Sequence, residues 1–86
     1  MQFEWDAGKA ASNLAKHGVR FEEGVRVWAG RIMEFDSDFA SEPRFVVLGQ
    51  VDGEVMAVVY TQRGDTKRII SARFASRQER RRYEEG

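Results

Sequence analysis

The feature that most constrains the fold is a change of hydrophobic period near residue 32. Before it, apolar residues recur at helical spacing, whereas from residue 32 to residue 74 they alternate with polar residues at a period of two. Such alternation predicts strands, and the runs that fit are 32–35, 45–51, 55–61 and 67–74. Asp52-Gly53 and Arg63-Gly64-Asp65-Thr66 are turn sequences between the last three runs, so we expect an antiparallel meander of about four strands.

Two helices are expected before the meander. A short strand at residues 3–5 precedes Asp6, which is suited to cap a helix that runs to residue 16 or 17 and stops at Gly18. A second short helix follows this one. Its apolar face consists of Phe21, Val25 and Trp28.

The sequence after residue 75 predicts a polar helix. Ser76 and Glu79 match a capping box, in which each side chain binds the backbone N–H of the other residue. From residue 77 to residue 85 only Tyr83 is notably hydrophobic, so this helix is either weakly docked or meets a polar partner. The predicted fold class is α+β: one domain over residues 1–86 with a short N-terminal strand, two helices, the meander and a C-terminal helix.

Composition excludes several classes of protein. The chain has 86 residues, which form one small domain of marginal stability, and it has no cysteine and a single histidine. Disulfides and thiolate metal sites are excluded and a histidine-cluster site is not expected, so we predict no metal and no cofactor. The N-terminus lacks the features of a signal peptide, and no apolar run is long enough to span a bilayer. We therefore expect a soluble protein of the cytoplasm.

A neutral chain ends in a basic segment. Residues 63–86 hold eight of the 14 Lys and Arg residues but only four of the 14 Asp and Glu residues. Cations near aromatic rings suit single-stranded RNA, because the cations meet phosphates and the bases stack on the rings. The cations concerned are Arg44, Arg63, Arg68, Arg73, Arg77, Arg80, Arg81 and Arg82, and the aromatic neighbours are Tyr60, Phe74 and Tyr83. Alternatively, the helix arginines pair with acids four residues later on a solvated face. These pairs would be Arg80 with Glu84 and Arg81 with Glu85.

Few side chains offer other chemistry. His17 is the first candidate for proton transfer, because histidine is the residue type that titrates near neutral pH, and a helix cap beside Gly18 is the alternative. Residues 37–43 predict an acidic loop, but Asp36 and Asp38 lack the further ligands of a calcium loop. No phosphate-binding glycine loop or nucleophilic serine motif is present. What remains is metal-free cleavage of RNA, in which the 2′-hydroxyl of the substrate is the nucleophile and arginines stabilise the charge on phosphorus.

The sequence also resembles the BrnT toxins of bacterial type II toxin-antitoxin systems, over nearly its whole length. The residues that carry the resemblance are Phe3-Glu4-Trp5-Asp6, Lys9, Asn13, Lys16-His17-Gly18-Val19, Phe21-Glu22-Glu23, Glu42, Arg44-Phe45, Gly49, Val59-Tyr60-Thr61, Arg63-Gly64, Arg68-Ile69-Ile70-Ser71-Ala72-Arg73, Ala75, Glu79 and Tyr83. Phe74 stands where this family often has another arginine. The resemblance implies a RelE-like fold and a metal-independent endoribonuclease that inhibits translation and growth. It also implies a hetero-oligomer with a BrnA-type antitoxin, which is a ribbon-helix-helix protein. The toxin would contact DNA only through this antitoxin.

We hypothesise roles for these residues on that basis. The scissile phosphate would be bound by Arg63, Arg68 and Arg73, with help from Arg44. Proton transfer would fall to His17 or Glu79, and the RNA would be held by Lys9, Lys16, Arg77 and Tyr83. Arg68 and Arg73 are an odd number of residues apart, so they can share a sheet face only if their strand bulges or twists between them. The alternative functions are a non-catalytic module that binds RNA or the ribosome, and a structural partner of a DNA-binding antitoxin.

Overall fold

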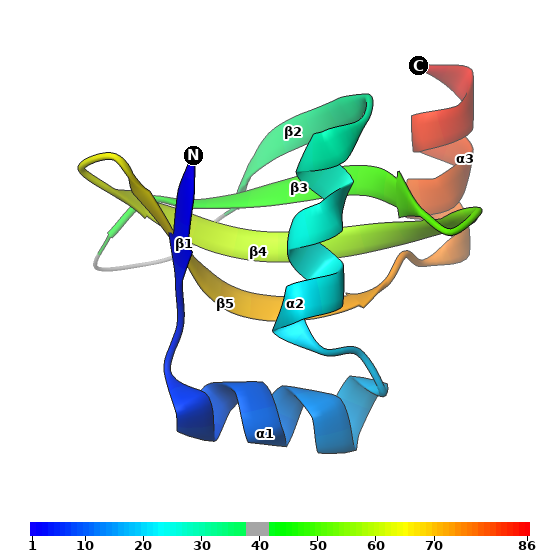
Figure 1. The fold of residues 1–86 in the computed structure, drawn as a ribbon. Helices are drawn as coiled ribbons and strands as arrows, with labels where there is room; N and C mark the ends of the chain where they lie inside the picture. Colours follow the sequence, from blue (N-terminus) through cyan, green and yellow to red (C-terminus); the bar gives the residue numbers. More distant parts are fainter. Residues whose placement is uncertain (38–41) are drawn as a thin grey trace.

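The computed structural model describes residues 1–37 and 42–86, so Asp38 of the predicted acidic loop lies outside the described residues. The elements, in chain order, are β1 (Gln2–Glu4), α1 (Ala7–His17), α2 (Phe21–Gly24), the 3₁₀ helix η1 (Val25–Ala29), β2 (Ile32–Ser37), β3 (Arg44–Val51), β4 (Glu54–Arg63), β5 (Thr66–Phe74) and α3 (Arg77–Glu85). The strands form one five-stranded sheet in the order β1-β5-β4-β3-β2. The predicted α+β class, with its N-terminal strand, helices, meander and C-terminal helix, is confirmed (Figure 1).

The meander forms because both predicted turns have a backbone that reverses a strand tightly. Asp52 and Gly53 have φ angles of 52° and 83°, the two positive angles that a type I′ hairpin turn needs. Gly64, with a φ of 59°, makes the turn from β4 into β5. The strands from β2 to β5 therefore pair antiparallel in succession, whereas β1 pairs with β5 in parallel.

The helices cover the two faces of the sheet unequally. In Figure 1, α2 and η1 cross one face, called here the α2 face, and α3 packs on one end of the opposite face, called the α3 face. The larger core lies on the α2 face and contains Val19, Phe21, Val27, Val47, Val51, Met56, Val58, Tyr60, Ile69 and Ala72. η1 approaches β3 closely because Gly49 has no side chain, and a Cβ there would lie 2.6 Å from the Cβ of Val27. A smaller cluster of Leu48, Val55, Ala57 and Tyr83 joins α3 to the sheet.

The outer edge of β5 is closed in two ways. β1 pairs with residues 66–68 only, and α1 lies beside the rest of that strand. There the buried amide of Asn13 takes the place of a strand, because its Oδ1 accepts from the Ala72 N–H at 3.1 Å and its Nδ2 donates to the Ala72 carbonyl at 2.7 Å. The same Nδ2 donates to the Val19 carbonyl at 3.0 Å. One side chain therefore connects the sheet edge, α1 and the loop that follows α1.

β5 contains a β-bulge at Ile70. Ser71 lies opposite Val59, but Ile69 lies opposite Tyr60, so Ile70 is an extra residue in the register with β4. The bulge shifts the alternation of side chains by one position. Residues on either side of the bulge that are an odd number apart therefore share a face. Arg68 and Arg73 are such residues.

The polar helix α3 is held at both ends. Tyr83 is only 5% exposed, and its hydroxyl donates to the Arg31 carbonyl at 2.8 Å. The Arg31 guanidinium lies 3.9 Å from the ring centre of Tyr83 and donates to the Tyr83 carbonyl at 2.6 Å. The predicted capping box is present, since Ser76 Oγ accepts from the Glu79 N–H at 3.1 Å and Glu79 Oε1 accepts from the Ser76 N–H at 2.9 Å.

The contacts of Asn13 predict a large stability loss in Asn13→Ala. Three buried hydrogen bonds to backbone groups disappear, and we expect the free energy of unfolding to fall by about 2–4 kcal/mol. Ser12→Ala, at the exposed position before it, is the control and should change this free energy by less than about 0.5 kcal/mol. Urea unfolding followed by circular dichroism gives both values. Equal losses in the two variants would contradict the bridging role of Asn13.

Candidate functional site

Three of the predicted phosphate-binding arginines lie on the α3 face of the sheet. Arg68 is opposite Thr61, and Arg73 is opposite Ala57. Directly opposed residues project to the same face, and Ala57 belongs to the cluster under α3. Because Thr61 and Ala57 are an even number apart on β4, Arg68 and Arg73 share this face. Arg63, two residues beyond Thr61, joins them.

Arg44 lies on the same face at the start of β3. It is opposite Ser37 of β2, and the next residue, Phe45, is opposite Tyr60 of the α2-face core. One row across the α3 face therefore consists of Glu4, Arg68, Thr61, Arg44 and Ser37. This row places Arg44 and Arg68 on either side of the same threonine.

A mostly apolar row, called here the central row, lies next to the arginine row. It consists of Ser71, Val59, Val46 and Phe35. Arg73 begins the row after it, where α3 covers the sheet. Successive rows on one face are roughly 7 Å apart, so the long side chains of Arg68 and Arg73 can reach over the central row from its two sides.

Two of these arginines pair with acids that come from elsewhere in the chain. Arg63 Nη2 lies 3.0 Å from Glu42 Oε1, and Arg68 Nη1 lies 2.8 Å from Glu4 Oε2. In each pair one carboxylate oxygen accepts from one guanidinium N–H group, a donor that a phosphate oxygen would also use. Both sites are therefore preformed for an anion, and RNA must displace a carboxylate to use them.

Glu79 is both a cap and the ion-pair partner of Arg73. The pair is bidentate, with N–O distances of 2.6 and 3.0 Å. The Arg73 guanidinium lowers the pKa of Glu79 from 4.5 to about 2, and hydrogen bonds from Ser76 add to this effect. The same pair raises the pKa of Arg73. Glu79 is thus ionised and weakly basic at neutral pH, which suits it to positioning Arg73.

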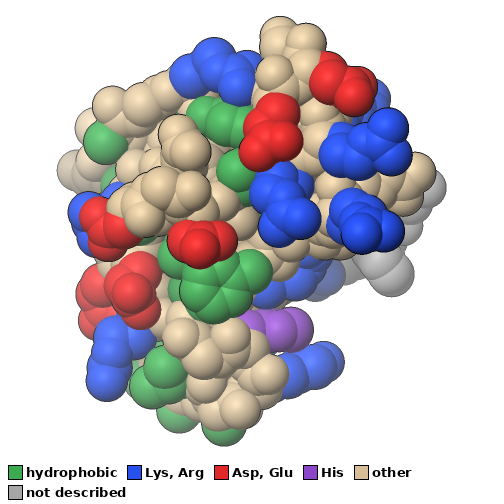
Figure 2. Space-filling model, turned by 90° about the vertical axis from the view of Figure 1, so that its right-hand side faces the viewer, with side chains coloured by type: hydrophobic (Ala, Val, Ile, Leu, Met, Phe, Trp, Pro, Cys, Tyr) green, Lys and Arg blue, Asp and Glu red, His purple; other side chains and the backbone are tan. Residues whose placement is uncertain are grey.

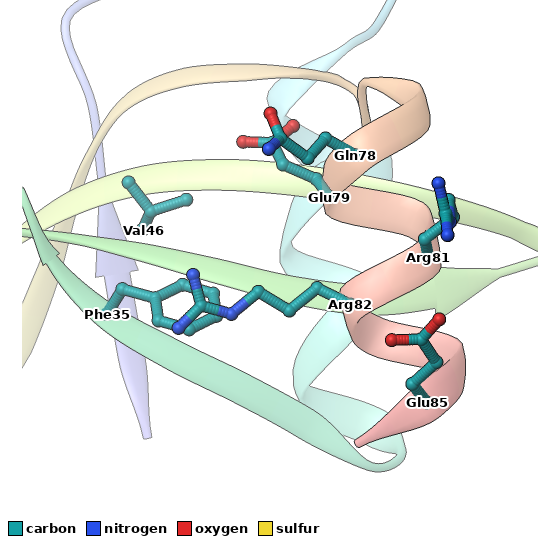
Figure 3. Close-up of a pocket in the computed structure, with 7 residues that line it drawn as sticks. All are labelled: Phe35, Val46, Gln78, Glu79, Arg81, Arg82 and Glu85. Atoms are coloured by element: carbon teal, nitrogen blue, oxygen red, sulfur yellow. The ribbon is translucent and has the colours of Figure 1, made fainter.

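A depression lies at each end of the central row. Towards β2 a cleft of about 550 Å³, called the α3 cleft, lies between the sheet and α3 (Figure 3). It is lined by Phe35, Val46, Gln78, Glu79, Arg81, Arg82 and Glu85. Towards the edge of β5 a groove of about 200 Å³, called the α1 groove, is lined by residues that include Lys9, Asn13, Lys16, His17, Ile70 and Ser71. A substrate strand along the central row would reach both depressions.

The α1 groove brings three predicted residues together, namely Lys9, Lys16 and His17. α1 ends at Gly18, whose φ is 69° and whose N–H donates to the Leu14 carbonyl at 2.8 Å. Within residues 1–37 and 42–86, the His17 side chain makes no hydrogen bond to the last carbonyls of α1, so Gly18 and not His17 caps the helix. The half-buried imidazole instead faces the groove beside Ser71.

Figure 2 shows the molecule from the right-hand side of Figure 1. Lys and Arg side chains gather at the upper right, and acidic side chains lie among them. The only histidine of the chain lies below this group, at the boundary with α1. Basic and acidic side chains are therefore interspersed on the face that this view shows.

The two residues of α3 that were predicted to hold RNA lie outside the α1 groove. Arg77 is exposed in the first turn of α3, and the Tyr83 ring is buried beneath that helix, where little of it could stack on a base. The alternative ion pairs of α3 are not seen in the described part of the chain. They were Arg80 with Glu84 and Arg81 with Glu85.

The aromatic residues expected beside the cations point mostly to the other face. Tyr60 is buried on the α2 face, and its hydroxyl donates to Glu34 Oε1 at 2.7 Å. Burial and this hydrogen bond raise the pKa of Tyr60, and Lys67 Nζ lies 4.6 Å from its ring centre. Phe74, 50% exposed, is opposite Met56 on the α2 face.

Sequence reasoning missed several contacts of this surface. Glu4 reaches Arg68 only through the parallel pairing of β1 with β5, which no local pattern indicates. Phe35 and Arg82 line one cleft, although they are far apart in the sequence. The period-two pattern could have placed Phe35 on one face of β2, but no sequence signal pairs it with a residue of α3.

Two absences hold for the described residues. No group of three or more His, Asp or Glu side chains among them is arranged to hold a metal ion. No helix in this part of the chain has the length and apolar character needed to cross a membrane.

A sheet face with fixed arginines, bordered by a polar helix and a histidine, defines a small α+β protein suited to binding a phosphate backbone. The family model of BrnT, the ribonuclease toxin of type II toxin-antitoxin systems, matches residues 5–79. The chain belongs to this family, so it is a ribonuclease toxin whose substrate is RNA and whose partner is an antitoxin. No curated protein matches the chain.

The pKa of Glu79 predicts a specific pH dependence of stability. Its folded-state pKa lies below its ordinary value of 4.5, so the Arg73 pair stabilises the fold above that pH and is lost as pH falls towards 2. Glu79→Gln should therefore be less stable than the wild type at pH 6, by on the order of 1 kcal/mol after allowance for solvent exposure. The difference should shrink between pH 4.5 and pH 2.

Urea unfolding of both proteins over this pH range measures the difference. Glu84→Gln, at an exposed position of α3, is the matched control and should show a small difference that does not depend on pH. A constant difference between the wild type and Glu79→Gln would contradict the ion pair.

Proposed function

We propose that this toxin is an endoribonuclease that cuts RNA without a metal ion, on the α3 face of its sheet. The observation that carries the proposal is the bulge at Ile70, which puts Arg68 and Arg73 on one face despite their odd spacing. Arg44 and Arg63 lie on the same face, and His17 lies at its edge. Fixed cations around an open strip of sheet are the arrangement that phosphoryl chemistry without a metal requires.

In the proposed reaction a base removes the proton of the 2′-hydroxyl, and this oxygen attacks the neighbouring phosphorus. The bond from phosphorus to the 5′-oxygen breaks, and that oxygen takes up a proton. The products are a 2′,3′-cyclic phosphate and a 5′-hydroxyl. No oxidant, reductant or added water takes part in this step.

The arginines bind the phosphate and the charge that develops on it. RNA displaces Glu4 and Glu42 from Arg68 and Arg63, and Arg44 acts from the opposite side of Thr61. Guanidinium groups are suited to this exchange, because their planar fork fits phosphate oxygens as well as carboxylate oxygens. Arg73, held by Glu79, approaches from the other side of the central row.

Proton transfer falls to His17, since the low pKa of Glu79 makes that carboxylate a weak base. Glu79 then contributes by orienting Arg73. Lys9 and Lys16 hold the RNA along the α1 groove, and Arg77 holds it from the first turn of α3. Tyr83 takes part by anchoring α3.

The partner in this proposal is a BrnA-type ribbon-helix-helix antitoxin, and the toxin contacts DNA only through it. The family membership and the exposed polar face of α3 support a hetero-oligomer of this kind. We infer that residues 1–86 act as a single RelE-like domain in the cytoplasm, where cleavage inhibits translation and growth. An antitoxin would also stabilise a small domain by mass action.

The role of Arg73 predicts a large activity loss in Arg73→Ala. We expect kcat/KM for a labelled oligoribonucleotide in EDTA to fall about 10²–10³-fold, because a donor to the transition-state charge is removed. Arg26→Ala is the matched control, since Arg26 also forms a bidentate ion pair but lies by the β3–β4 turn. Intact RNA with wild-type protein in excess would overturn the nuclease mechanism, and retained RNA binding would then favour a binding module.

The role of His17 predicts that His17→Ala cuts more slowly and binds normally. We expect kcat to fall about 10²–10⁴-fold, because proton transfer is lost, while the affinity for a non-cleavable 2′-O-methyl RNA stays within about twofold. Lys16→Ala, in the same groove, should instead weaken RNA binding. A parallel loss of affinity and rate in His17→Ala would assign His17 to binding alone.

A further inference from the structure

The α3 cleft contains a planar cation that lies against an aromatic ring. Arg82 extends from α3 across the cleft, and its guanidinium carbon lies 4.2 Å from the ring centre of Phe35 (Figure 3). Within the described residues no carboxylate or carbonyl binds this guanidinium. The ring therefore supports one face of the guanidinium plane, and its N–H groups remain available to a ligand.

The cleft is continuous with the phosphate-binding surface. Val46 and Phe35 belong to the central row, and Glu79, which lines the cleft, also holds Arg73. From Ser71 on β5 to Val46 on β3 is two strand spacings, or roughly 10 Å. Neighbouring nucleotides of an extended strand can bridge that span. A phosphate between Arg68 and Arg73 would thus have an adjacent base within reach of the cleft.

We propose that the α3 cleft is a nucleobase-binding site, in which an RNA base next to the scissile phosphate stacks on the Arg82 guanidinium. This proposal rests on the proposed function, because it takes the RNA path from the arginines of that reaction. Unstacked bases of single-stranded RNA stack on arginine planes and aromatic rings. The cleft supplies an arginine backed by an aromatic ring, over an apolar floor that includes Val46.

Polar groups at the rim of the cleft allow one base to be preferred over others. Figure 3 shows Gln78 and Glu79 reaching over the same side of α3 as Arg82. The Gln78 amide can donate and accept hydrogen bonds, whereas the Glu79 carboxylate accepts only. Because Glu79 is committed to Arg73 and Ser76, Gln78 is the residue that reads the base edge.

A scan with abasic RNA tests the stacking. Oligoribonucleotides made non-cleavable with 2′-O-methyl groups each lack one base, and fluorescence anisotropy gives their affinities for the wild type and for Arg82→Lys. Lysine keeps the positive charge but lacks the planar guanidinium group. We expect one abasic position to weaken the wild type about tenfold or more, and to weaken Arg82→Lys by less than about twofold. Phe35→Leu should behave in the same way as Arg82→Lys, because it removes the ring that orients the guanidinium.

Two matched controls distinguish the loss of stacking in the cleft from the general effect of an Arg-to-Lys or a Phe-to-Leu substitution. Arg80→Lys makes the same exchange on an exposed residue of α3 that does not line the cleft, and Phe74→Leu removes a half-exposed ring on the α2 face. Both controls should keep the abasic penalty of the wild type. Replacement of Gln78 by Ala should reduce the preference among bases at the position found by the scan.

The outcomes are distinct for the two proposals. An abasic penalty that is the same in Arg82→Lys and in the wild type overturns the nucleobase site, even if the all-ribose RNA is cut. Penalties that depend on Arg82, without any cleavage of the all-ribose RNA, support the base site and overturn the nuclease mechanism. Unchanged RNA binding together with weaker antitoxin binding by Phe35→Leu would assign the cleft to the protein partner, and would overturn the proposal.

Discussion

The fold depends on how the outer edge of β5 is closed. An exposed strand edge presents unpaired N–H and C=O groups, and β1 covers only residues 66–68 of this one. The Asn13 amide satisfies both backbone groups of Ala72, because it contains a donor and an acceptor in the arrangement of a peptide group. This contact fixes α1 against the sheet. It thereby fixes His17 beside the central row, so the same hydrogen bonds that complete the sheet also place the candidate proton-transfer group.

The bulge at Ile70 resolves a conflict within β5. In a regular strand Arg68 and Arg73 would project to opposite faces, and one of them would enter the core on the α2 face. Burying an unpaired charge there would cost several kcal/mol. With one extra residue in register, Ile69 and Ala72 both enter that core, while the two arginines stay on the open face. The packing of the core and the placement of the cations are therefore satisfied by one local irregularity.

The sequence was informative where interactions are local. The turn at Asp52-Gly53 requires positive φ angles, and the Ser76 cap joins residues three apart, so both follow from neighbouring side chains. Arg68 and Glu4 are 64 positions apart, and their contact depends on a parallel pairing that no neighbouring residue indicates. The bulge could be predicted only in part. The odd spacing of the arginines required an irregularity somewhere between them, but the register with β4 was needed to locate it at Ile70.

The ion pairs balance the charge of the surface that we propose to bind phosphates. Glu4 and Glu42 come from outside the basic segment and hold Arg68 and Arg63 extended over the sheet, so non-specific polyanions meet a surface that is already balanced. In the proposed reaction, a transition state with two negative charges competes better for these arginines than a ground-state phosphate with one. Displacing the carboxylates costs the same free energy in both states, so in the proposed reaction the advantage of the transition state comes from its additional negative charge. Such differential binding is what accelerates a chemical step, whereas the displaced carboxylates lower the affinity of the arginines for phosphates in general.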